Sequence, residues 1–220
     1  MERIPLGHRW SLARLEYAAD AALHALALAG ACWAAVVALS RSLAADDPAI
    51  AWSLAVYVAG MFLLGAASAA YNLTLYHGRD GRLRRLDHAS IFVMIAGTYT
   101  PFCVIAIGGF WGGALLGIVW TLSVQGMVMR LIGWPSREGV ASLAYLFVGW
   151  VVVLAIVPLI EALPAGGLAW LVLGGVLYSV GVIFYIWDGL HFHRVIWHGF
   201  VVAGATSHAV AIFSFVVPAR

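Results

Sequence analysis

The sequence contains no lysine, and all twelve of its basic residues are arginine. Retinal proteins attach their chromophore to a lysine amine as a Schiff base. The missing lysine therefore excludes a retinal-binding photoreceptor, which the number of apolar segments described below would otherwise suggest.

Cysteine and charge are also scarce. The two cysteines, Cys32 and Cys103, both lie in apolar runs, which argues against a disulfide framework and against a thiolate metal site. Only 10% of the residues are charged, compared with roughly 25% in soluble domains. With 64% hydrophobic residues, the chain is not expected to form a water-soluble fold.

Long apolar stretches take up most of the chain. A hydrocarbon core about 30 Å thick needs around 20 apolar helical residues. Seven stretches meet this requirement, at approximately 18–40, 49–73, 87–107, 112–131, 139–160, 166–187 and 194–217. The sequence therefore predicts an all-α integral membrane protein. It consists of a short cytoplasmic segment, residues 1–17, followed by one seven-helix transmembrane domain, residues 18–217.

The arginines predict the orientation of the bundle, because cytoplasmic loops hold the excess of basic residues. Ten of the twelve fall on the side of the N-terminus, and only Arg41 and Arg220 fall on the other side. We therefore expect a cytoplasmic N-terminus and, after seven crossings, an extracytoplasmic C-terminus.

Polar residues inside the apolar helices collect near the predicted cytoplasmic face. Because such residues are costly in a membrane, they mark a candidate site. Eight of them form the predicted polar pocket: Asp20, His24, Ser68, Asn72, Asp87, His88, Arg194 and His198. Each also has a structural interpretation, since the aspartates suit the positive end of a helix dipole and the histidines suit core packing. Their gathering at one face favours the functional interpretation.

The remaining histidines are expected to have other roles. His8, His77, His191 and His193 are predicted to lie in water, in the N-terminal segment and the cytoplasmic loops. His208 lies ten residues after His198, about 15 Å further along a helix, and is predicted to make a separate polar contact within the bundle. Pro101 falls inside the third predicted span and is expected to kink it.

Three segments resemble a known family. LDHASIFVMIAGTYTPF at residues 86–102 resembles the third helix of the bacterial haemolysin III proteins, which belong with the progestin and adipoQ receptors, including the adiponectin receptors. GGVLYSVGVIFYIWD from Gly174 and IWHGFVVAGATSHA from Ile196 are similar to the sixth and seventh helices of that family. The resemblance covers roughly residues 16–217.

The resemblance implies a zinc ion near the cytoplasmic face. In the family, one histidine of a Ser-x3-His motif and two of a His-x3-His motif hold the metal beside an aspartate. Here Asn72 stands at the first ligand position and Arg194 at the second, so that His198 alone is retained, together with Ser68 and Asp87. Arginine has no lone pair to offer a metal. We therefore expect no zinc at these positions, and no cofactor unless the family site is preserved in some other way.

The first helix also departs from the family pattern Glu-x2-Asn-x3-His. Tyr17 stands in place of the glutamate and Asp20 in place of the asparagine, while His24 is retained.

The resemblance, together with these substitutions, implies a non-catalytic haemolysin III protein of the bacterial inner membrane, acting in membrane homeostasis or in permeabilisation (cytolysis). The alternative is a zinc-dependent, ceramidase-like hydrolase of lipid amides, with Asp87 and Ser68 as candidate catalytic residues. A third possibility is a receptor or transport module with a lipid in the bundle cavity. Membrane lipids are the expected partners, and no nucleic acid is expected. We also expect Arg194 to replace the charge of the zinc by forming an ion pair with Asp87.

Overall fold

The computed structural model describes residues 6–74, 81–135 and 138–217, and within these ranges the chain is helical and contains no strand. The helices are α1 (Leu6–Ala45), α2 (Pro48–Thr74), α3 (Gly81–Pro101), α4 (Gly109–Leu131), α5 (Glu138–Trp150), α6 (Ile156–Ala162), α7 (Ala165–Tyr185) and α8 (His193–Ala211). Short π-helical or 3₁₀ segments at Phe102–Ile107, Val151–Ala155 and Ile212–Val216 extend or join them.

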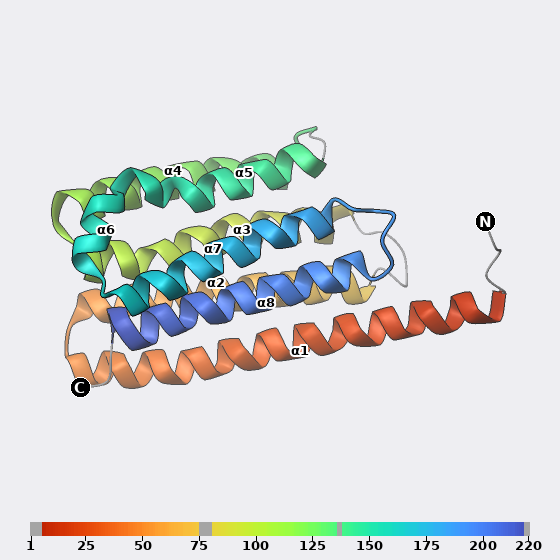
Figure 1. The fold of residues 1–220 in the computed structure, drawn as a ribbon, viewed down its shortest axis with the longest axis horizontal. Helices are drawn as coiled ribbons and strands as arrows, with labels where there is room; N and C mark the ends of the chain where they lie inside the picture. The colour runs from red at the N-terminus through yellow and green to blue at the C-terminus, as the bar shows by residue number, and fades with distance from the viewer. Residues whose placement is uncertain (1–5, 75–80, 136–137, 218–220) are drawn as a thin grey trace.

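Seven of the helical stretches are long and apolar enough to cross a membrane, which confirms the predicted fold class of a multi-pass membrane protein. Six lie close to the expected positions. The first differs, because α1 is continuous from Leu6 and its apolar span begins at Leu12. Much of the segment that was expected to precede the first span is therefore part of the same helix, and α1 projects beyond the other helices at its N-terminal end (Figure 1).

The spans form a ring in which neighbours in sequence are neighbours in space. Packing runs from α1 to α2, α3 and α4, then through α5 to α7 and α8, and α1 closes the ring against α8. Figure 1 shows α1 running alongside α8, although these helices come from opposite ends of the chain. The third span is the most buried, and it packs between α2 and α4.

The turn between α1 and α2 shows how local sequence sets an element boundary. Asp46 adopts a left-handed conformation with φ of 48°, which ends α1. The Asp47 carboxylate then accepts a hydrogen bond from the backbone N–H of Ala49 at 2.8 Å, and Pro48 occupies the first position of α2. The Asp-Asp-Pro sequence thus separates the first two spans.

Pro101 marks a change of helix geometry in the third span. The α-helix ends at Pro101 and continues as a π-helix from Phe102. The hydroxyls of Thr98 and Thr100 donate to the carbonyls of Met94 and Ala96, at 2.9 and 2.8 Å.

The fifth span contains an irregularity that the sequence did not suggest. Instead of one helix over 139–160, α5 ends at Trp150 and a 3₁₀ segment leads into α6. The Tyr99 hydroxyl, from α3, donates to the carbonyl of Gly149 at 2.6 Å and accepts from the N–H of Val152 at 2.9 Å. A side chain from another helix thus satisfies backbone groups that the break would leave without partners inside a membrane.

Most arginines of the described helices collect at one end of the bundle, because the spans alternate in direction, whereas Arg41, near the end of α1, lies at the other end. Arg14 lies early in α1, Arg82, Arg84 and Arg85 begin α3, Arg130 ends α4 and Arg194 begins α8. Which membrane face this end occupies stays a prediction.

Candidate functional site

A cavity of about 690 Å³ lies within the bundle, lined by residues of α1, α2, α3, α5, α7 and α8. Most of its wall is apolar or aromatic, with side chains such as Met61, Met94 and Tyr178. Seven of the eight predicted pocket residues line it, namely His24, Ser68, Asn72, Asp87, His88, Arg194 and His198. The eighth, Asp20, is buried and contacts both His24 and His198. The structure therefore brings the predicted residues together.

Asp20 and His24 come from successive turns of α1. The ring Nδ1–H of His24 donates to the backbone carbonyl of Asp20 at 2.7 Å, so that Nε2 carries the lone pair of the neutral imidazole. Nε2 lies 3.2 Å from the Ser68 hydroxyl of α2. Two hydrogen bonds thus fix the orientation of the His24 ring, whose residue is only 5% exposed.

On α2, Asn72 is turned back toward its own helix. Its side-chain N–H groups donate to the Ser68 carbonyl at 3.0 Å and to the Ser68 hydroxyl at 3.2 Å. The Ser68 hydroxyl also faces the Asp87 carboxylate of α3. Asn72 therefore positions Ser68, which in turn connects α1, α2 and α3.

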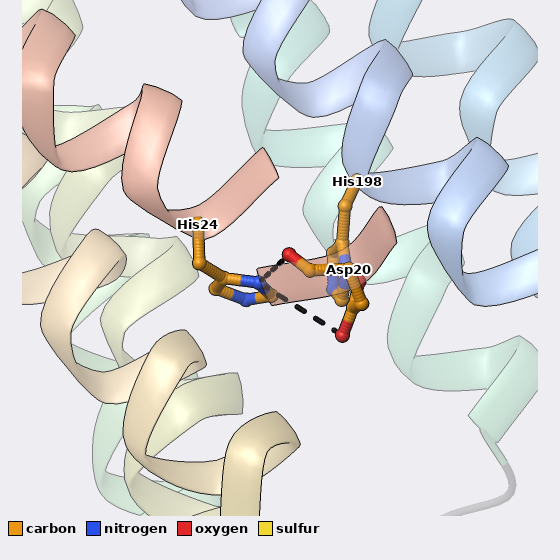
Figure 2. Close-up of side chains that lie close together, drawn as sticks. All are labelled: Asp20, His24 and His198. Atoms are coloured by element: carbon orange, nitrogen blue, oxygen red, sulfur yellow. Dashed lines mark hydrogen bonds and ion pairs between the residues drawn. The ribbon is translucent and has the colours of Figure 1, made fainter. Parts of the chain in front are cut away.

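The closest polar contact of the site joins α1 to α8. The Nδ1–H of His198 donates to Oδ1 of Asp20 at 2.5 Å, while Oδ2 of the same carboxylate lies 3.8 Å from Nδ1 of His24. The two imidazole rings meet edge to face, with centroids 4.7 Å apart. Figure 2 shows the three side chains converging, with Asp20 and His24 contributed by α1 and His198 by α8.

The expected ion pair between Arg194 and Asp87 is not formed, and this prediction was wrong. Both residues are described, and Arg194 lines the cavity, but the ion pairs found in the described part of the chain join Asp20 to His24 and His198. In the packed bundle α8 lies against α1 and α7, whereas α3 lies against α2 and α4. The carboxylate that forms a hydrogen bond to α8 is the one on α1, through His198, although Asp87 on α3 also lies close enough to His198 for an electrostatic interaction.

The other predicted residues have varied surroundings. His88 is buried, and its carbonyl accepts a hydrogen bond from Tyr145 at 3.2 Å. His208 donates to the carbonyl of Leu171 at 3.1 Å, which is the separate contact that was expected. His191 is exposed, as predicted.

For two of the four histidines that were expected to face water, the structure describes no side chain. A third, His193, does not face water as expected. The side chain of His8 and all of His77 lie outside the described residues. His193 lines the cavity, and within the described ranges its buried Nδ1 has no hydrogen-bond partner. It begins α8, and the start of that helix turns it inward instead of leaving it in a solvated loop.

The residues at the family's zinc-ligand positions do not fit a zinc ion. The Asn72 amide is engaged by Ser68, and Arg194 has no lone pair to donate. A different set has suitable donors, because ligand atoms of Asp20, His24 and His198 all lie within 4.8 Å of one another. All three residues belong to the predicted polar pocket, but their combination as a ligand set was not expected from the sequence. The one local signal for it is the Asp-x3-His spacing on the first helix.

Comparison with known proteins agrees with the architecture. The model of a family described as haemolysin-III related matches residues 18–209. The chain is 38% identical to Hemolysin-3 of Bacillus cereus over 164 residues, which are 74% of each protein. It is 36% identical to the Hemolysin-3 homolog of Bacillus subtilis over 165 residues, 75% of this chain and 78% of the relative. It is also 25% identical to the human Monocyte to macrophage differentiation factor over 223 residues, 97% of this chain and 90% of the relative.

Proposed function

The chain belongs to the haemolysin III-related family of multi-pass membrane proteins, and we propose that it is a non-catalytic member that binds a lipid within its bundle. Its proposed location is the bacterial inner membrane, and its proposed role is in membrane homeostasis. The observation that carries the proposal is the cavity, with its apolar wall and its polar end.

The size and lining of the cavity suit a single-chain lipid. Its volume of about 690 Å³ falls within the roughly 300–1,000 Å³ of typical ligand pockets, which combine apolar walls with a few polar groups. The wall carries apolar side chains of several helices, such as Leu23, Met61 and Val201, against which a hydrocarbon chain can pack.

The polar end favours an anionic headgroup. Arg194 lines the cavity, and the ion pairs of the described residues do not engage it. A guanidinium can hold a carboxylate or phosphate through two parallel hydrogen bonds. A fatty acid, or a lysophospholipid with its phosphate at the same place, is therefore the proposed class of ligand.

Two substitutions argue against the alternative, a zinc-dependent hydrolase of lipid amides. Catalytic zinc needs three protein ligands and an open position for water. At the family's ligand positions Asn72 is held against Ser68, and Arg194 has no lone pair to offer a metal, so neither position supplies a ligand. Ser68 and Asp87, the candidate catalytic residues, are then parts of a polar network that supports the cavity.

The experiment measures binding and hydrolysis on the same preparation. The full chain in detergent is titrated with a fluorescent fatty acid and, in zinc-containing buffer, is incubated with a short-chain ceramide. We expect saturable binding that Arg194→Met weakens and His191→Ala leaves unchanged, with no release of fatty acid from ceramide. Zinc-dependent release by the unmodified chain would establish the hydrolase instead.

Permeabilisation, the other role considered from the sequence, has its own readout. The purified chain is incorporated into phospholipid vesicles that contain a self-quenching dye, with empty vesicles as the control. A role in homeostasis predicts no more dye release than from the empty vesicles. Release that rises with protein density would assign the chain to cytolysis.

A further inference from the structure

We propose that Asp20, His24 and His198 form a binding site for a divalent transition-metal ion that joins α1 to α8. The three side chains converge, two from the first span and one from the seventh (Figure 2). Their ligand atoms all lie within 4.8 Å of one another. This set differs from the family's ligand positions, with which it shares only His198.

The donors are of the right chemical kind. Two imidazole nitrogens and one carboxylate are a common set for zinc, and they also suit other first-row transition metals. Neutral imidazoles with one carboxylate leave a divalent ion with a net charge of only +1. Burying this net charge of +1 costs less free energy than burying the +2 of an ion held by neutral ligands alone.

The distances are compatible with coordination after small side-chain movements. Zinc–ligand bonds of about 2.0–2.1 Å in a tetrahedron place ligand atoms about 3.3 Å apart. Nδ1 of His198 and Oδ1 of Asp20 are now 2.5 Å apart, with the proton of Nδ1 in the hydrogen bond between them. A metal would replace that proton and move the two atoms slightly apart, whereas the more distant atoms of the set would move together.

His24 is already oriented by a hydrogen bond of the kind that commonly orients metal-binding histidines. In such sites the second ring nitrogen usually donates to a carbonyl or carboxylate, which fixes the tautomer. The Nδ1–H of His24 donates to the Asp20 carbonyl at 2.7 Å, and the lone pair of Nε2 faces the Ser68 hydroxyl at 3.2 Å, which a metal bound to Nε2 would displace. Asp20 and His24 are 8% and 5% exposed, so the site is largely shielded from competing water.

Arg194 is the feature that opposes metal binding. It lies four residues before His198 on α8, and therefore on the same helix face. Its fixed charge should weaken the affinity for a cation. We therefore expect Arg194→Met, which removes this charge, to increase the affinity for the metal.

The test uses the full chain without a histidine tag, purified with a chelator and then dialysed against zinc. Zinc is counted per chain by mass spectrometry, and affinity is measured in competition with a chromophoric chelator. Cobalt is added separately, because its visible absorption reports the coordination geometry. We expect one ion per chain, affinity lowered at least roughly tenfold by Asp20→Asn and by His24→Gln, and no change for His191→Ala.

Two further readouts keep the test independent of variant folding. X-ray absorption on the zinc-loaded unmodified chain should count two imidazoles, and zinc should raise the melting temperature because the ion binds only the folded bundle. Less than 0.2 zinc per chain would overturn the proposal. So would binding that survives Asp20→Asn and His24→Gln, or an absorption spectrum with a single imidazole.

Discussion

The side chain of His198 in α8 donates a hydrogen bond to Asp20 in α1, with Nδ1 and Oδ1 2.5 Å apart and 178 residues between them in the sequence. α1 and α8 are the two helices that close the ring of spans. A charge-assisted hydrogen bond between two largely buried side chains therefore links the first span to the seventh.

This contact predicts strong coupling between the two residues. We expect Asp20→Asn and His198→Gln each to lower the free energy of unfolding, and the double variant to lose clearly less than the sum. The coupling should be about 0.5–3 kcal/mol, as for residues in direct contact. Thermal unfolding in detergent with a chelator present measures it, and Asp20→Asn combined with His191→Ala serves as the additive control pair.

Arg194 and Asp87, in contrast, should act independently. Because no ion pair joins them, Arg194→Met and Asp87→Asn are expected to change the free energy of unfolding additively, within about 0.5 kcal/mol. The same unfolding assay decides the question. A loss of stability in the double variant far smaller than the sum of the single losses would show that Arg194 and Asp87 do form an ion pair.

Gly174 in α7 is predicted to resist even the smallest side chain. A Cβ there would lie 2.2 Å from Cδ2 of His208, whose ring is held by its hydrogen bond to Leu171. We expect Gly174→Ala to cost about 1–3 kcal/mol, the usual range for overpacking. Gly117→Ala in α4 is the matched control, since a Cβ at Gly117 meets no atom within 4 Å. Equal melting temperatures for the two variants would contradict the packing described here.

Tyr99 is predicted to stabilise the break in the fifth span. Tyr99→Phe removes the hydroxyl that bonds to Gly149 and Val152, and leaves two backbone groups without that partner. We expect a cost of about 1–3 kcal/mol, together with faster hydrogen exchange at Val152. Trp120→Phe, which removes a single hydrogen bond to Thr100, provides the comparison and should cost less. Unchanged exchange at Val152 would show that the break does not depend on Tyr99.

The topology predicted from the arginines can be tested directly. A reporter fused after Arg220 should behave as extracytoplasmic, and one inserted between Arg79 and Arg85 as cytoplasmic, since basic loops are retained in the cytoplasm. Paired alkaline phosphatase and fluorescent protein fusions at both points give opposite signals for the two compartments. The reverse pattern at both points would invert the proposed orientation.

The sequence by itself determined the fold class and its main boundaries. The apolar segment lengths required seven spans, because an apolar helix must match the thickness of the hydrocarbon core, and the Asp-Asp-Pro sequence at Asp46–Pro48 ended the first of them. The gathering of polar residues at one end also followed from the sequence. Residues near the same ends of alternating helices must meet at one face, wherever each helix lies in the ring.

Only the tertiary structure decided which of these residues touch. Helical spacing gives the neighbours of a residue on its own helix, such as Asp20 and His24, but carries no information on which helix lies opposite. The packing of α1 against α8 places Asp20 within hydrogen-bond distance of His198, whereas Arg194 forms no ion pair with Asp87. The break at Trp150 has the same origin, because its backbone groups bond to Tyr99, about 50 residues earlier in another helix. Contacts between helices depend on the shape of their packed surfaces, and that shape exists only once the helices have assembled.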